Sequence, residues 1–110
     1  MGVIRGSLVT FIVPGAYGKP RPALVIQSDL FHDHPSVTIL PITSELRPTP
    51  LFRISVEPTA GNGLLHPSQI MIDKIQTVPI NKTGPAIGTL DAALMVQVSR
   101  SLALFLGFAG

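Results

Sequence analysis

The chain has 110 residues, of which 45% are hydrophobic and only 13% are charged, and its formal net charge is +2. This length fits one domain over residues 1–110, and the low charge content, against the usual 25% or so, indicates surface hidden in an oligomer. No apolar run reaches the roughly 18 residues of a membrane span, no signal-peptide layout opens the chain, and the absence of cysteine excludes disulfides and thiolate chemistry. We therefore expect a cytoplasmic protein, and the mild positive charge permits a nucleic-acid partner without requiring one.

The first 88 residues predict short strands separated by turns, because prolines and glycines recur throughout them. Ser7–Val13 is rich in β-branched and aromatic residues and is typical of a buried strand. Strands are also expected over Ala23–Gln27, over Val37–Ile42 and near Pro85–Ile87.

Two segments alternate between apolar and polar residues, as half-buried strands do. Leu51–Glu57 is expected to turn Phe52, Ile54 and Val56 toward the core and Arg53, Ser55 and Glu57 away from it. Gln69–Ile75 is expected to turn Ile70 and Ile72 inward and Gln69, Met71 and Asp73 outward, and to bend or end at Lys74.

The tail "TLDAALMVQVSRSLALFLG" contains no internal glycine or proline and predicts a helix. Thr89 or Asp91 is expected to cap its start, and Gly107 its end. One apolar stripe is expected to pack on the strands, formed by Leu94, Val98, Leu102 and Phe105. A second is expected to face another subunit, formed by Met95, Val96, Leu104 and Leu106. The fold class is therefore mainly β with a C-terminal helix, as a small, partly open barrel.

The stretch "YGKPRPALVIQSD" places Arg21 between Pro20 and Pro22, directly ahead of an apolar strand. The prolines restrict their neighbours to extended conformations, so the arginine stands on a stem of low backbone entropy. Its guanidinium offers a planar fork of donors suited to phosphate. An exposed arginine that closes an ion pair with Asp29 or Glu45 is the alternative.

Other candidate groups lie where strands open into loops. In "LPITSE", Pro41 indicates the edge or the end of a strand, and the hydroxyls of Thr43 and Ser44 can contact phosphate or cap a turn. Asp73 can act as a general base, pair with an arginine or begin a turn. His32 and His34 could share a metal only on a strand, and a polar loop is the preferred interpretation, as a loop or turn is for His66.

These segments occur in an order that resembles the MazF/PemK (Kid) family of toxin endoribonucleases. The matching elements are "RGSLVTFIVPGAYGKPRPALVIQSD", "VTILPITSE", "LFRISVEP", "GLLHPSQIMIDKIQTV" and "IGTLDAALMVQVSRSLALFLG". The resemblance implies an SH3-like, partly open barrel of the CcdB/PemK type that forms a homodimer. It also implies cleavage of single-stranded RNA, typically mRNA, without metal or cofactor, to 2′,3′-cyclic phosphate and 5′-hydroxyl ends, and inhibition by a cognate antitoxin.

The resemblance places the family's catalytic arginine on Arg21 and its threonine on Thr43, while Asp73 matches an acidic position of the Kid branch. Met71 replaces the arginine that the branch has two residues before this acid. The loop "GAYGKPRP" also lacks the histidine or carboxylate of many members. The general base is therefore left open between Asp73, a water molecule and no efficient base at all. The expected RNA-binding residues are Tyr17, Lys19, Ser44, Arg53 and Gln69.

Two other functions share this fold. A CcdB-like gyrase poison binds a protein target and cuts nothing, and it is disfavoured because the members with that activity carry a C-terminal tryptophan motif that this chain lacks. A barrel that has lost catalysis and only binds is the other alternative.

Overall fold

The computed structural model describes residues 3–12 and 19–109. Its strands, in chain order, are β1 (Ser7–Ile12), β2 (Pro20–Val25), β3 (Ser36–Thr43), β4 (Arg53–Val56), β5 (Ser68–Met71), β6 (Gln76–Pro79) and β7 (Thr83–Thr89). Its helices are the short 3-10 helices η1 (Asp29–Phe31), η2 (Ile72–Lys74) and η3 (Ile80–Lys82) and the α-helix α1 (Ala92–Phe105). This confirms the prediction of a mainly β chain that ends in a helix.

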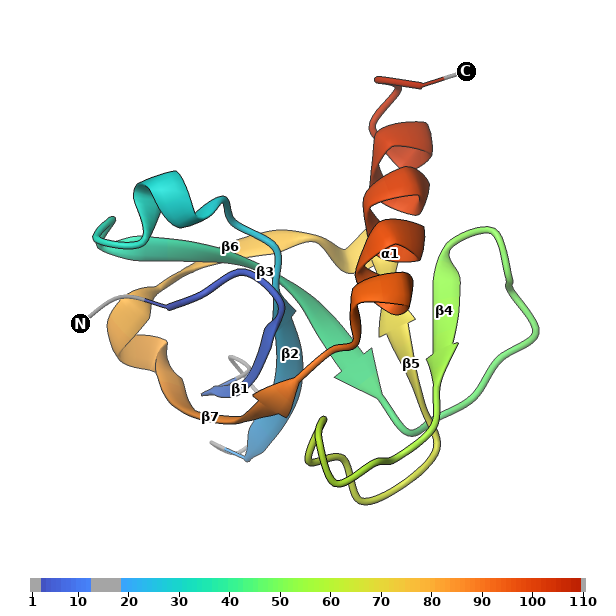
Figure 1. Cartoon of the computed structure of the whole chain (residues 1–110), viewed down its shortest axis with the longest axis horizontal. Coiled ribbons are helices and arrows are strands. Elements are labelled where there is room, and N and C mark those ends of the chain that lie inside the picture. Colours follow the sequence, from blue (N-terminus) through green and yellow to red (C-terminus); the bar gives the residue numbers. More distant parts are fainter. Residues whose placement is uncertain (1–2, 13–18, 110) are drawn as a thin grey trace.

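The strands of the described residues form one curved antiparallel sheet in the order β4-β5-β3-β2-β1-β7, and β6 also pairs with β3. β6 pairs with β3, and η3 connects β6 to β7, which pairs with β1. The segment from β6 to β7 therefore links β3 to β1, and the sheet curls into a partly open barrel (Figure 1). The helix α1 stands over the part of the sheet made by β3, β4 and β5 (Figure 1).

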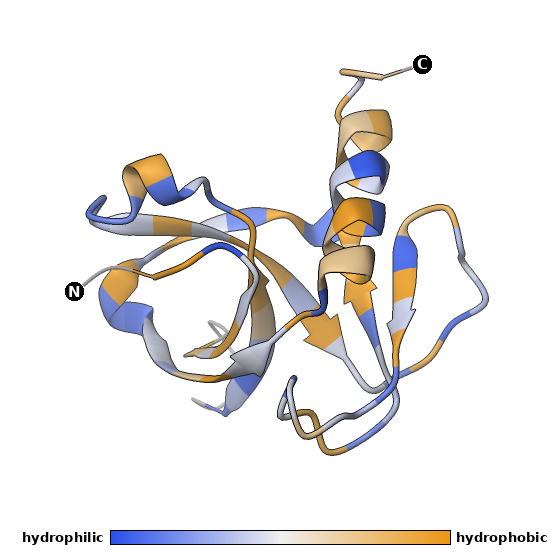
Figure 2. Cartoon of the chain, viewed as in Figure 1, coloured by the Kyte–Doolittle hydropathy of each residue, from blue (hydrophilic) through white to orange (hydrophobic). Residues whose placement is uncertain are grey.

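Buried apolar side chains lie on both faces of this sheet, so the core has two parts. Inside the curl lies a small cluster made of Val9, Phe11, Ala23, Val25, Val37, Ile39 and Val78. Between the sheet and α1 lies a larger cluster that includes Leu8, Leu24, Leu40, Ile54, Ile70, Val98 and Leu102. The alternation of β4 between polar and apolar residues is visible in Figure 2, and it turns Ile54 and Val56 into the larger cluster as predicted.

The helix begins and ends at residues with recognisable capping chemistry. The Asp91 carboxylate accepts a hydrogen bond from the Leu94 N–H at 2.8 Å, while Thr89, the other predicted cap, belongs to β7. Gly107 has φ +82° just after the last turn, the conformation that glycine adopts most easily. Phe105, predicted to face the core, is 50% exposed, so the inward stripe ends at Leu102.

Two strand predictions were incomplete. The strand predicted over Gln69–Ile75 ends at Met71, where η2 begins, so Asp73 lies in a 3-10 helix and does not continue the face of Gln69. The strand β6 was not predicted, because four residues that end in proline carry little local signal. Within the described ranges, no helix is long and apolar enough to span a membrane.

Candidate active site

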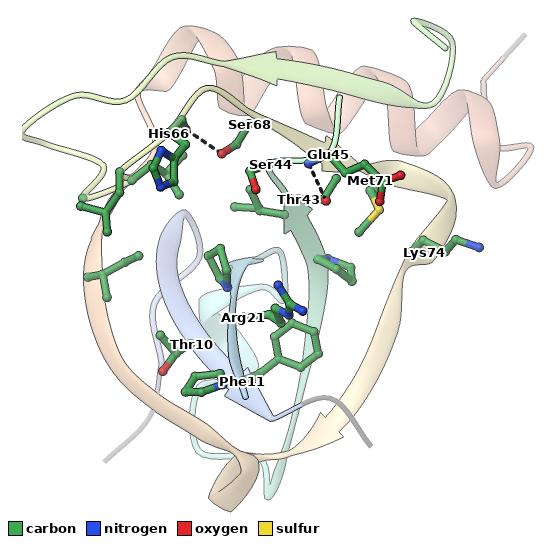
Figure 3. Close-up of a pocket in the computed structure, with 18 of the residues that line it drawn as sticks. Thr10, Phe11, Arg21, Thr43, Ser44, Glu45, His66, Ser68, Met71 and Lys74 are labelled. Carbon is green, nitrogen blue, oxygen red and sulfur yellow. Dashed lines mark hydrogen bonds between the residues drawn. The ribbon is translucent and has the colours of Figure 1, made fainter. Parts of the chain in front are cut away.

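A groove of about 760 Å³ opens at one end of the barrel. It is lined by residues of β1, β2, the end of β3 with the two residues after it, the loop between β4 and β5, β5 itself, the η2–β6 segment and β7. Figure 3 shows Arg21 near the middle of this groove and Thr43, Ser44, Glu45 and His66 around it. The structure therefore brings together three residues that the sequence analysis selected separately, namely Arg21, Thr43 and Ser44.

The groove begins where β2 and β3 part, and a proline explains why they part there. Paired residues of antiparallel strands alternate between those that exchange backbone hydrogen bonds and those that do not. The Ile26 N–H donates to the Thr38 carbonyl at 3.2 Å. Every second residue before Ile26 should therefore form a backbone hydrogen bond with β3, which selects Leu24 and then Pro22. Pro22 has no N–H to donate, and the pairing with β3 ends at Ala23.

A second proline sits where β3 changes partner. β6 pairs with β3 over Ser36–Ile39, whereas β5 pairs with it at Ile42 and Thr43. Pro41 lies opposite Ala23 in a pair that does not exchange hydrogen bonds, so its nitrogen points to the other edge, between these two partners. The proline thus removes no ladder bond, and β3 continues for two residues beyond it, to Thr43.

The register of β2 and β3 sets Arg21 across from Thr43. Their last pair is Ala23 with Pro41, and two further residues on each strand lead to Arg21 and Thr43. Arg21 is exposed, and the two partners considered for it bond other residues. The Asp29 carboxylate accepts from the Arg5 N–H at 2.7 Å, and Glu45 pairs with Arg47.

Thr43 caps a turn and still faces the groove. Its Oγ1 accepts a hydrogen bond from the Glu45 N–H at 3.0 Å (Figure 3). A hydroxyl that accepts one bond keeps its own proton for another acceptor. Turn-capping and phosphate contact, which the sequence analysis set against each other, are therefore compatible at Thr43, and the exposed Ser44 adds a second hydroxyl beside it.

Gln69 and Arg53 hold a loop in place and do not line the groove. Gln69 is 8% exposed, and its Oε1 accepts from the Arg47 N–H at 2.9 Å and from Arg53 Nη1 at 3.0 Å. Its Nε2 donates to the Arg47 carbonyl at 2.9 Å, and Arg53 Nη1 also donates to the Glu45 carbonyl at 2.9 Å. Both side chains thereby fix the segment that carries Ser44 and Glu45.

Three further predicted site residues lie elsewhere. Asp73 is half-buried in η2 and is not part of the groove lining, in contrast to its neighbour Lys74. Lys19 is exposed ahead of β2, also outside the lining. Tyr17 lies outside the described residues.

His66 is a groove residue that the sequence did not indicate, and its imidazole points toward the groove from the loop between β4 and β5 (Figure 3). In the sequence "GLLHPSQ", the glycine Gly63 indicates a turn but no function for the histidine, and in the structure its φ is +71°. The ionisable side chains that line the groove, among the described residues, are Arg21, Glu45, His66 and Lys74. Within residues 3–12 and 19–109, no group of three or more histidine, cysteine or acidic side chains could hold a metal ion.

Comparison with known proteins agrees with this architecture. An endoribonuclease from a mycobacterial species, solved in complex with its cognate antitoxin, superimposes with a TM-score of 0.82 over 98% of both chains at 21% identity. The toxin MazF-mt6 of Mycobacterium tuberculosis superimposes with a TM-score of 0.78, over 92% of this chain and 96% of its own, at 26% identity. This chain thus has the fold of these two toxin endoribonucleases.

The sequence comparisons specify the family. The profile of the PemK-like, MazF-like toxins of type II toxin–antitoxin systems matches residues 5–106. A probable endoribonuclease MazF of Mycolicibacterium smegmatis is 46% identical over 107 residues, which cover 96% of this chain and 98% of that protein. The chain therefore belongs to the PemK-like, MazF-like toxin family, and it is an endoribonuclease of the MazF type. The resemblance found in the sequence is confirmed.

Proposed function

We propose that this toxin cleaves single-stranded RNA, typically mRNA, by attack of the substrate's own 2′-hydroxyl on the adjacent phosphorus. The expected products are a 2′,3′-cyclic phosphate and a 5′-hydroxyl, and no metal or cofactor is needed because the nucleophile belongs to the substrate. The observation that carries the proposal is that an exposed Arg21 and the hydroxyl groups of Thr43 and Ser44 line one open groove.

Arg21 is the phosphate-binding group of this mechanism. Its guanidinium stays protonated at any working pH, so it stabilises the charge that develops on the phosphoryl oxygens. Pro20 and Pro22 restrict its stem, which limits the ordering required when RNA binds. Thr43 donates a hydrogen bond to a non-bridging oxygen, and Ser44 contacts the phosphate beside it. Lys19 and Tyr17 remain proposed RNA contacts.

Apolar side chains dominate the rest of the groove and suit nucleobases. Pro20, Pro22, Leu65, Met71 and Ile87 are among its lining residues. Single-stranded RNA is recognised by proteins that splay its bases onto such surfaces, and splaying also helps to align the 2′-oxygen with the bond that breaks. We therefore assign base selection to these walls and phosphate binding to the Arg21 side.

Two protein partners belong to the proposal. A cognate antitoxin is expected to cover the groove, in keeping with the antitoxin complex of the structurally similar mycobacterial endoribonuclease. A homodimer is expected because the helix end exposes Leu104, Phe105 and Leu106 at 65%, 50% and 44%, which would be costly in water. Sedimentation equilibrium tests the dimer, and a single-chain species at every concentration would contradict it.

The cleavage assay uses purified protein and a long single-stranded RNA in EDTA, with the new ends mapped. We expect defined cuts that carry 5′-hydroxyl ends, and fragments with 2′,3′-cyclic phosphates. Cuts that need an added divalent ion, or that carry 5′-phosphates, would contradict attack by the 2′-hydroxyl. Intact RNA, combined with gyrase-linked DNA breaks, would replace the proposal with a gyrase poison.

A further inference from the structure

We propose that His66 is the general base of this groove, the group that accepts the proton of the attacking 2′-hydroxyl. The inference rests on the proposed RNA cleavage and deepens it, because neither Arg21 nor Thr43 is suited to take up a proton. It replaces Asp73, which the sequence analysis considered for this role and which does not line the groove.

The His66 side chain lies in the groove and is accessible to a bound substrate. It is exposed, it lines the same groove as Arg21 and Thr43, and Figure 3 shows its ring directed into the groove space. Only its main chain is engaged: the Ser68 hydroxyl donates to the His66 carbonyl at 2.8 Å (Figure 3). Neither ring nitrogen is hydrogen-bonded to another of the described residues, so both remain available to substrate.

A tightly bonded turn fixes the loop that carries His66. Asn62 is 4% exposed, and its Oδ1 accepts from the Thr59 and Leu64 N–H groups, each at 3.0 Å. Its Nδ2 donates to the Glu57 carbonyl at 2.9 Å. The last residue of this network, Leu64, lies two residues before His66, so the main chain that leads to the imidazole is held by a buried, satisfied network.

The same turn is docked directly against β7. The Thr89 N–H donates to the Gly61 carbonyl at 2.9 Å. A Cβ on Gly63 would overlap the Ile87 carbonyl oxygen, and a Cβ on Gly88 would overlap the main chain of Asn62. Backbone lies against backbone at both places, an approach that only glycine permits. A loop held this closely keeps a catalytic side chain within the small tolerance that proton transfer requires.

Histidine is also the residue whose ordinary chemistry fits the task. A ring nitrogen of imidazole that carries no proton accepts one readily, and histidine is the side chain that most often acts as a general base. Arginine stays protonated. Glu45, the carboxylate of the lining, is held in an ion pair with Arg47. The charged groups that share the groove with His66 are Arg21 from β2, Glu45 after β3 and Lys74 of η2.

The step balances without a metal or a co-reactant other than water. The 2′-oxygen loses its proton to the neutral imidazole and forms a bond to phosphorus. The bond from phosphorus to the 5′-oxygen breaks, and that oxygen takes a proton from groove water. The imidazolium then releases its proton to solvent, which restores His66 and leaves the 2′,3′-cyclic phosphate and the 5′-hydroxyl.

The test compares His66→Ala and His66→Gln with the wild type on the mapped RNA, at saturating substrate and across pH. His34→Ala is the matched control, because His34 is exposed but lies outside the groove lining. We expect both His66 variants to cut about 10²- to 10⁴-fold more slowly and His34→Ala to cut normally. Wild-type cleavage should depend on pH, and His66→Ala should lack this dependence. Added imidazole should restore cutting by His66→Ala.

Affinity for an RNA with a single 2′-deoxy substitution at the cleavage site separates catalysis from binding, and we expect it to be unchanged. Wild-type rates in both His66 variants would overturn the assignment while leaving RNA cleavage itself established. Slow cutting that keeps the pH dependence and ignores imidazole would equally overturn it. Failure of the wild type to cut RNA would instead refute the proposed function.

Discussion

Replacing Asn62 with alanine should destabilise the protein strongly, although the side chain lies outside the groove. The substitution removes three hydrogen bonds made by the amide, those with the Thr59 N–H, the Leu64 N–H and the Glu57 carbonyl. The net contribution of each hydrogen bond to the free energy of unfolding is about 1 kcal/mol, and a buried polar group left without a partner costs about 1–3 kcal/mol. We therefore expect a loss of about 3 kcal/mol in the free energy of unfolding.

Thermal unfolding followed by circular dichroism measures this loss. For a domain near this size, 1 kcal/mol corresponds to about 4 °C or more in Tm, so Asn62→Ala should melt about 12 °C or more below the wild type. Asn81→Ala is the control, since Asn81 is exposed in η3 and should change stability by less than about 0.5 kcal/mol. Equal melting of the two variants would refute the view that this turn is a rigid support for His66.

Two further substitutions separate structural support from RNA contact. Gly88→Ala should cost about 1–3 kcal/mol in urea unfolding, because its Cβ would overlap the main chain of Asn62, and its effect should not add to that of Asn62→Ala, since both loosen one turn. Full additivity of the pair would contradict a shared contact. Gln69→Ala should lose about 2 kcal/mol of stability with cleavage positions unchanged, because its amide bonds Arg47 and Arg53. New cleavage positions at unchanged stability would instead identify Gln69 as a base-reading residue.

Much of the fold could be predicted because its signals are local. The alternation of Leu51–Glu57 identified β4 and its buried face, and Asp91 and Gly107 marked the ends of α1. β6 could not be predicted, because its short segment becomes a strand only by pairing with β3, which is distant in sequence. Phe105 fits the helical spacing, but the sheet does not extend beneath the last turn, and the ring is half-exposed.

The residues of the site also fall into two groups, those that local sequence signals identify and those that depend on tertiary contacts. Arg21 and Thr43 were found because proline places both at strand ends, and the register then sets them across the groove. Gln69 was predicted to face outward, which alternation supports, yet a loop distant in sequence folds over it and uses its amide. His66 could not be found, because the close approach of Gly88 to Asn62 that aims its loop is a tertiary contact.

Arg21 is the residue on which the account depends most. Arg21→Ala should cut the mapped RNA about 10²- to 10³-fold more slowly, the cost of removing one preorganised donor to a developing charge. Arg21→Lys should also be slow, because a point charge does not replace the planar fork. Tm should not change in either variant, since the side chain is exposed.

The most direct measurement is therefore the cleavage rate of Arg21→Ala in EDTA beside that of Arg100→Ala, which removes an exposed arginine from α1. We expect wild-type cutting by Arg100→Ala and almost none by Arg21→Ala, with both proteins folded. Equal rates for the two variants would show that the groove between β2 and β3 is not where RNA is cut.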